Sequence, residues 1–102
     1  MNNSELLKQV LDPLLEDYHY WFDRSQELLE SGPLEVISAA DQSQLLAQVR
    51  DAQAELRAAE SLYRLSENEV GIDPKLMAKW HRLLMACADL GLKYRQHRYP
   101  AE

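Results

Sequence analysis

The sequence predicts an all-α fold, an antiparallel up-down-up bundle of three helices with coiled-coil-like packing. Ala, Leu, Glu, Gln and Arg dominate the 102 residues, whereas Thr is absent and Val and Ile form no long runs. Apolar residues recur at alternating steps of four and three in three separate stretches. Two short links, each containing a Gly, join these stretches. Because short links favour antiparallel neighbours, we expect one helical-bundle domain over residues 1–102.

The first helix is expected over about residues 4–30. Its apolar seam comprises Leu7, Leu11, Leu14, Tyr18, Trp21 and Leu28, with Ser25 in the one polar slot. Asp12-Pro13 is typical of a helix start, yet the seam keeps its phase across Pro13. We therefore expect a short helix over 4–11 that runs, kinked or collinear, into a longer one over 13–30. Gly32-Pro33 ends it.

The second helix is expected over about residues 39–66, with Ser38 or Asp41 as its N-cap. Its seam comprises Leu45, Val49, Ala52, Leu56, Ala59 and Tyr63. Two of these six positions are Ala, so this helix can approach a neighbour closely. The apolar residues of the preceding link are expected to fold back over the core; they are Leu34, Val36 and Ile37.

The third helix is expected over about residues 74–97, started by Asp73-Pro74 and stopped by Pro100. Its seam comprises Leu76, Trp80, Leu83, Cys87, Leu90 and Tyr94. The core is expected to consist mostly of Leu, Trp21, Trp80 and the tyrosines. Heptad seams do not specify their partner, so a homodimer in which two chains share one bundle stays open.

The net charge of −6 is unevenly distributed. Residues 1–73 hold 15 Asp and Glu against 5 Lys and Arg, whereas residues 74–102 hold 2 against 6. The first segment therefore carries −10 and the second +4. This balance disfavours general nucleic-acid binding, but the basic C-terminal end suits an acidic surface.

Cysteine usage and hydropathy predict a cytoplasmic protein without a membrane span. Cys87 is the single cysteine, so the chain forms no internal disulfide. The N-terminal residues lack the basic start and apolar run of a signal peptide. No stretch approaches eighteen consecutive apolar residues.

The sequence contains no recognisable catalytic machinery, so we expect neither an enzyme nor a cofactor. The three glycines are too scattered for a phosphate-binding loop, and Cys87 lies on an apolar seam. Glu16 and His19 form a Glu-x-x-His pair, the spacing with which di-iron bundles present two ligands. Such a site needs the motif twice, and His81 and His97 have no acidic residue three positions earlier. A metal-carrying helical bundle that uses Glu16 and His19 remains the alternative function.

Two features indicate a protein-binding surface. Tyr20 lies off the apolar seam, which makes it a candidate contact residue rather than a core residue. Arg95, His97 and Arg98 precede Tyr99 at the basic end of the third helix. Cations there also complement the helix dipole, so this end serves either as a helix terminus or as a docking surface.

Several short motifs resemble a family of small cyanobacterial proteins known only as a domain of unknown function. They are Pro13-Leu14-Leu15-Glu16-Asp17, Tyr20-Trp21-Phe22, Arg24-Ser25 and Trp80-His81. The resemblance spans nearly the whole chain, and it implies a cyanobacterial protein in the cytosol or facing the thylakoid. It implies no activity, cofactor or catalytic residue. The expected function is that of an adaptor, assembly factor or small regulator of one protein partner, linked to photosynthetic complexes. Peripheral thylakoid association is a further expectation.

Overall fold

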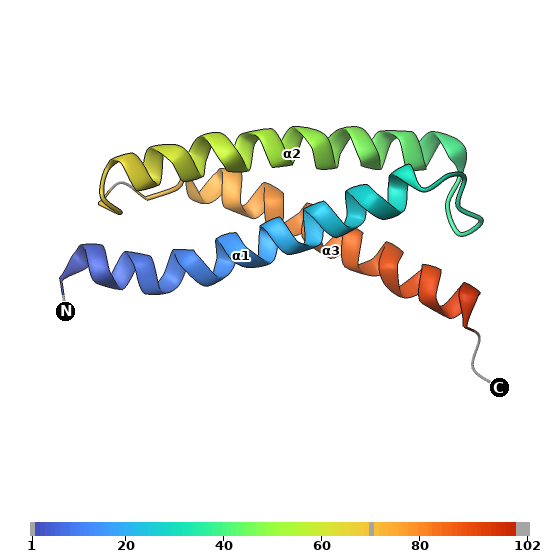
Figure 1. Cartoon of the computed structure of the whole chain (residues 1–102), viewed down its shortest axis with the longest axis horizontal. Helices are drawn as coiled ribbons and strands as arrows, with labels where there is room; N and C mark the ends of the chain where they lie inside the picture. The colour runs from blue at the N-terminus through green and yellow to red at the C-terminus, as the bar shows by residue number, and fades with distance from the viewer. Residues whose placement is uncertain (1, 70, 100–102) are drawn as a thin grey trace.

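The computed structural model describes residues 2–69 and 71–99, and all regular structure in these ranges is helical. The helices are α1 (Asn3–Glu30), α2 (Ala39–Leu65) and α3 (Pro74–Arg98). Figure 1 shows α2 running back along α1, and α3 running in the same direction as α1. The all-α, up-down-up prediction is confirmed.

Helix α1 is continuous through Pro13, so the first helix is not divided between 11 and 13. Proline has no N–H to donate to the carbonyl of Gln9, four residues earlier. Because Pro13 is exposed, water can reach that carbonyl. The flanking residues Leu11 and Leu15 are both buried, and their burial holds the helix together across the missing hydrogen bond.

The side chain of Gln42 in α2 forms hydrogen bonds with the backbone at the end of α1 and in the link between α1 and α2. Its Nε2 donates to the carbonyls of Leu29 and Gly32, at 3.0 and 2.9 Å, and its Oε1 accepts from the N–H of Leu34 at 3.0 Å. Gly32 has a φ of 122°, a conformation that side chains rarely permit. Ser38 is the N-cap of α2, because its Oγ accepts from the N–H of Asp41 at 3.1 Å. As expected, the apolar residues of the link pack against the core.

The second connection begins with two residues at positive φ, Glu67 and Asn68. Their N–H groups donate to the carbonyls of Arg64 and Tyr63, which closes the C-terminal end of α2. The predicted start of α3 is confirmed, since the side chain of Asp73 accepts from the N–H of Lys75 at 2.9 Å.

The core lies along the line where the three helices meet. Its buried hydrophobic members are Leu11, Leu15, Tyr18, Phe22, Leu29, Val49, Ala52, Leu56, Tyr63, Trp80, Cys87 and Leu90. The α2 and α3 seams predicted from the sequence supply the buried hydrophobic residues of these helices as expected, and Gln53, which lies off the predicted α2 seam, is buried as well. Polar contacts close the edge between α1 and α2. His19 pairs with Glu60 at 3.0 Å, and Arg50 with Glu30 at 2.8 Å.

The buried face of α1 differs from the predicted seam: part of the predicted seam lies on the side of α1 that faces α3. The fully buried line contains Leu15, Phe22 and Leu29, while Leu14, Trp21 and Leu28 are only half-buried. Helix α1 packs along α2 for much of its length, but it meets α3 mainly where the two helices cross. The side chains of α1 that face α3 therefore remain partly exposed to solvent. The prediction that Trp21 belongs to the core was wrong.

Helix α3 diverges from α2 toward its C-terminal end (Figure 1), and the two helices share little direct contact. The radius of gyration is 16.0 Å, whereas a compact domain of about 100 residues has about 13 Å. The elongated shape, 51 × 29 × 20 Å, reflects the length of the helices, 28, 27 and 25 residues, together with the divergence of α3. It opens grooves on both sides of α3.

Candidate functional site

A groove of about 380 Å³ lies between the C-terminal halves of α1 and α3, and we name it the α1–α3 groove. On α1 it is lined by Trp21, Arg24, Ser25 and Leu28. On the α3 side it is lined by Cys87, Gly91, Tyr94, Arg95, Arg98 and Tyr99. Apolar and aromatic surface thus forms much of the groove, and three arginines stand around it.

The three arginines of the groove have no acidic partner among the described residues. Arg24, Arg95 and Arg98 form no ion pair with any carboxylate in the described part of the chain, and no carboxylate there lines the groove. Among the described residues outside the groove, Arg50, Arg64, Lys79 and Lys93 are each paired with an Asp or Glu, whereas Lys8, Arg57, Lys75 and Arg82 form no ion pair but do not line this groove. Three uncompensated guanidinium groups give the groove a positive potential in a chain of net charge −6.

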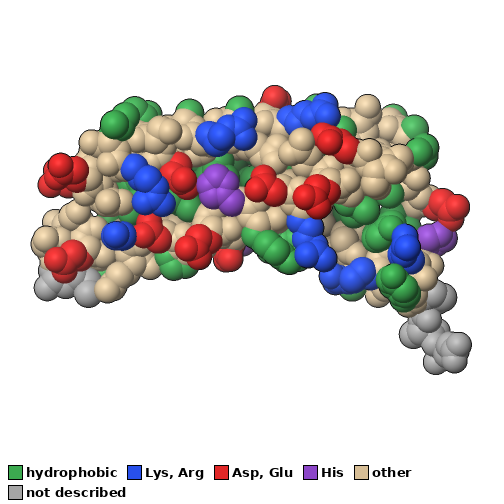
Figure 2. Space-filling view, viewed as in Figure 1, with side chains coloured by type: hydrophobic (Ala, Val, Ile, Leu, Met, Phe, Trp, Pro, Cys, Tyr) green, Lys and Arg blue, Asp and Glu red, His purple; other side chains and the backbone are tan. Residues whose placement is uncertain are grey.

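Figure 2 shows one face of the molecule, with Lys and Arg side chains at the left and along the top, where Asp and Glu lie near them, and also at the lower right. Lys and Arg side chains lie beside hydrophobic ones at the lower right, where α3 leaves α1. Most Asp and Glu side chains of this face lie farther left, along α1 and α2.

Tyr20, Trp21 and Arg24 form one cluster on the α1 side of the groove. The rings of Tyr20 and Trp21 meet edge to face with centroids 5.4 Å apart. The guanidinium of Arg24 lies 5.7 Å from the centroid of the Tyr20 ring and donates to its hydroxyl at 3.0 Å. Tyr20 is 53% exposed and does not itself line the groove, but it orients the Arg24 side chain that does.

Arg98 is held in a similar way on the α3 side. It donates to the hydroxyls of Tyr94, at 2.9 Å, and Tyr99, at 3.3 Å. These hydrogen bonds, with Tyr99 first, raise the pKa of the Arg98 guanidinium because they stabilise its charged form. Planar arginines held against aromatic rings suit the bidentate recognition of carboxylates.

The predicted partner-binding residues thus fall into one neighbourhood, with one exception. Arg95, Arg98 and Tyr99 line the α1–α3 groove, and Tyr20 contacts two of its lining residues. His97 does not line the groove, because its Nε2 lies 2.5 Å from a carboxylate oxygen of Glu35 in the first link. His97 therefore ties the end of α3 to the link after α1.

Glu16 and His19 do not form a shared ligand pair. His19 points to α2, where its Nε2 lies 3.0 Å from Oε2 of Glu60. Within residues 2–69 and 71–99, no group of three or more His, Cys, Asp and Glu side chains is arranged to hold a metal ion.

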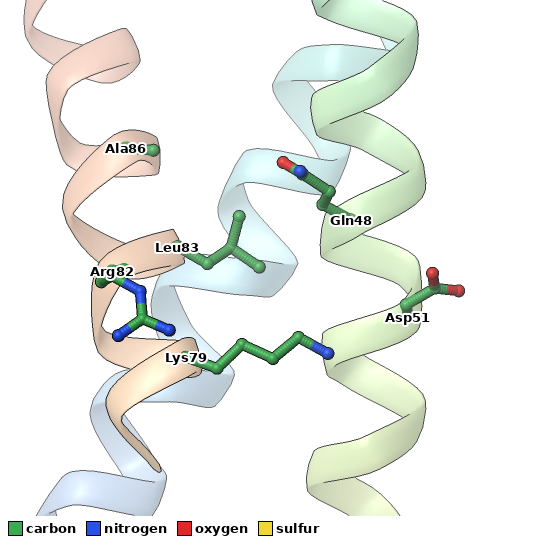
Figure 3. Close-up of a pocket in the computed structure, with 6 residues that line it drawn as sticks. All are labelled: Gln48, Asp51, Lys79, Arg82, Leu83 and Ala86. Atoms are coloured by element: carbon green, nitrogen blue, oxygen red, sulfur yellow. The ribbon is translucent and has the colours of Figure 1, made fainter. Parts of the chain in front are cut away.

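A second groove, of about 360 Å³, separates α2 from α3 (Figure 3). The Lys79 side chain reaches across it toward α2, and its Nζ lies 2.9 Å from both carboxylate oxygens of Glu55. Asp51 and Arg82 also line this groove, so its charge is mixed. It offers no surplus of one charge to a partner.

Sequence reasoning missed Trp21, Arg24, Gly91 and Tyr94 as groove residues. Trp21 and Tyr94 occupy apolar-seam positions, which made them core candidates. A signal for Arg24 existed in the sequence, since it follows Tyr20 by four residues and so lies on the same helix face. Nothing in the sequence shows that α1 and α3 diverge beside these residues.

The family model described as "Protein of unknown function (DUF2605)" matches residues 1–96. The match includes every segment that carries the resemblance noted above. No curated protein and no solved structure matches the chain. In the described part of the chain, no helix has the length and apolar character needed to cross a membrane.

Proposed function

The chain belongs to the family of proteins of unknown function named DUF2605, and we propose that it is a non-enzymatic interaction module that binds an acidic segment of a protein partner. The binding surface is the α1–α3 groove. The observation that carries the proposal is the convergence of Arg24, Arg95 and Arg98 on one aromatic-lined groove, where none of them pairs with a carboxylate of residues 2–69 and 71–99.

Charge and surface chemistry both support a protein segment as the ligand. Arg, Trp and Tyr are the residue types that most often dominate the binding energy of protein interfaces, and all three line this groove. Unpaired arginines attract acidic residues and raise the association rate at low ionic strength. Trp21 and Tyr94 are half-buried, so burying the rest of their surface would add apolar binding energy.

The proposal extends to the cellular compartment of the protein and to the class of complex that contains its partner. We propose a cytoplasmic location, which the single cysteine, unable to form an internal disulfide, supports. On the resemblance alone, we extend the proposal to partners among cyanobacterial photosynthetic complexes, reached by peripheral association with the thylakoid.

The test compares two triple variants that change the net charge equally. In the groove variant, Arg24, Arg95 and Arg98 are each changed to Glu. In the control variant, Lys8, Arg57 and Lys75 are each changed to Glu; these cations are exposed, line no groove described above and form no ion pair with the described residues. Tagged wild-type chain and both variants are used for affinity recovery from native cells, and the recovered polypeptide is cross-linked and mapped.

We expect wild type and control to recover the same polypeptide, and the groove variant to lose it by at least about tenfold, since one buried charge pair contributes 1.4 kcal/mol or more. The cross-linked segment should be rich in Asp and Glu, and recovery should decrease between low salt and about 0.5 M salt. Equal recovery by both variants would refute the proposal, as would cross-links to a segment without acidic residues.

A further inference from the structure

Gly91 lies in the interior of α3, and no contact among the described residues explains why a glycine occupies this position. Glycine is, after proline, the residue least favourable to a helix interior. The backbone of Gly91 is helical, so no positive φ requires glycine there. A Cβ added at Gly91 would have no atom within 4 Å, so no neighbouring segment requires its absence either. Gly32, by contrast, is explained by its φ of 122°.

The open space above Gly91 is the α1–α3 groove. A glycine on a helix surface allows the backbone of another element to approach more closely than a side chain would. Because no described residue makes that approach, the space above Gly91 is available to a partner.

The walls of the groove favour a helix over an extended segment. Both walls are helices, and the described ranges contain no strand whose edge an extended peptide could pair with. The α3 wall runs from Cys87 to Tyr99, which at 1.5 Å per residue is about 18 Å, or about three helical turns. A helix of a partner that packed against this wall would be the fourth helix of the bundle and would fill the α1–α3 groove.

The charges define which helix faces fit. Between the arginines the groove is lined by Gly91, Leu28 and the rings of Trp21 and Tyr94, so the face of the partner helix that meets them must be apolar or small. Arg24 on α1, and Arg95 and Arg98 on α3, stand on opposite walls. Acidic residues on both flanks of the apolar face would meet these arginines.

We propose that the occupant of the α1–α3 groove is an acidic amphipathic helix of a protein partner, about three turns long, whose backbone packs over Gly91. This inference rests on the proposed function, that the groove binds an acidic protein segment, and adds the conformation of that segment and its point of closest approach.

The probes are two peptide display libraries of equal length and Glu content, selected against the intact wild-type chain. One library is built on a continuous helix with a randomised face. The other carries two central prolines, which prevent the helix. Selected peptides are then measured against Gly91→Leu, against Ala78→Leu as an exposed α3 control, and against the Arg24, Arg95 and Arg98 to Glu variant.

We expect binders from the helical library at least about tenfold tighter than those from the other library, a difference of 1.4 kcal/mol. Gly91→Leu should weaken them by at least about tenfold, because it fills the space over the helix, and Ala78→Leu should leave them unchanged. Failure to select any helical binder, equal affinity of the proline-containing peptides, or full affinity for Gly91→Leu would each overturn the inference.

The arginine variant separates this inference from the proposed function. If the arginine variant loses the proline-containing and the helical binders alike, while Gly91→Leu has no effect, the result would agree with the proposed binding of an acidic segment and would refute only its helical conformation. If the arginine variant binds all peptides as wild type does, both proposals are wrong. A homodimer in solution that Gly91→Leu dissociates would show that a second copy occupies the groove and would overturn the partner helix.

A stability measurement tests the premise without any ligand. Gly91→Ala should raise the melting temperature by about 2–6 °C, because alanine favours the helix and meets no neighbour. A lower melting temperature would show that the fold itself needs glycine at this position, and it would overturn the inference that a partner helix packs over Gly91.

Discussion

The indole ring of Trp80 packs edge-on against the phenol ring of Tyr18, with centroids 5.6 Å apart and planes at 64°. This contact joins α3 to α1 where the two helices cross. Trp80 is completely buried, yet its Nε1 finds no hydrogen-bond partner among the described residues. The crossing therefore depends on aromatic packing, and it contains one polar group that costs stability.

Replacing Trp80 separates these two effects. Trp80→Phe removes the unpaired N–H but keeps most of the ring contact, so we expect a loss of unfolding free energy of less than about 1.5 kcal/mol. Trp80→Ala removes the whole ring, and the cavity should cost about 3–5 kcal/mol. Urea unfolding of both variants measures the difference. A Phe variant as unstable as the Ala variant would mean that the indole N–H has a partner.

The two prolines that follow an Asp should respond oppositely to alanine. Pro13→Ala restores a hydrogen bond to the carbonyl of Gln9 inside α1, so the unfolding free energy should rise by about 1–3 kcal/mol. Pro74→Ala, at the first turn of α3, should leave it unchanged or lower it by up to about 1 kcal/mol. Thermal unfolding compares the pair. Similar shifts for both would contradict a continuous α1.

Gln42 is predicted to stabilise the first link through its three backbone contacts. At about 1 kcal/mol for each hydrogen bond, Gln42→Ala should cost about 2–3 kcal/mol. Gln42→Glu should cost at least as much, because a carboxylate cannot donate to the carbonyls of Leu29 and Gly32. Gln44→Ala, an exposed neighbour on α2, serves as the control and should shift stability by less than about 0.5 kcal/mol. Equal effects at 42 and 44 would rule out the role of Gln42.

The thiol of Cys87 should make stability depend on alkaline pH. Burial raises the pKa of Cys87, and a hydrogen bond with Ser25 opposes the shift only in part. As pH rises past about 8.5, the usual pKa of cysteine, the unfolded chain loses this proton before the folded chain does. The stabilising contribution is therefore complete below that pH and is lost as pH rises through the folded pKa.

We expect the melting temperature to fall above about pH 8.5 and to fall less steeply for Cys87→Ala. Tyr18 provides the comparison. Its pKa is raised by burial and then by Asp17, so Tyr18→Phe should flatten the decline only above about pH 10. A Cys87→Ala profile parallel to that of wild type between pH 8 and 10 would show that the thiol titrates normally. Slow reaction of native Cys87 with a thiol reagent would agree with its 2% exposure.

The sequence by itself determined the helices, because their signals are local. Ser38, one of the two candidates that the sequence offers, caps α2, Asp73 caps α3 as predicted, and the periodic apolar residues of those two helices supply most of their buried faces. The Asp-Pro pairs mark the limit of such reasoning. Asp73-Pro74 starts a helix, whereas Asp12-Pro13 lies inside one, because buried Leu11 and Leu15 on either side hold α1 together.

Only the tertiary structure decided where the helices separate, and with that the candidate site. Trp21 and Tyr94 have the spacing of core residues, and they line the α1–α3 groove only because α3 turns away from its neighbours. The same divergence creates one groove that is lined by both Arg24 and Arg95, although the two residues lie seventy-one positions apart in the sequence. A helical period fixes which residues share a face, but burial depends on what packs against that face, and this is a property of long-range contacts.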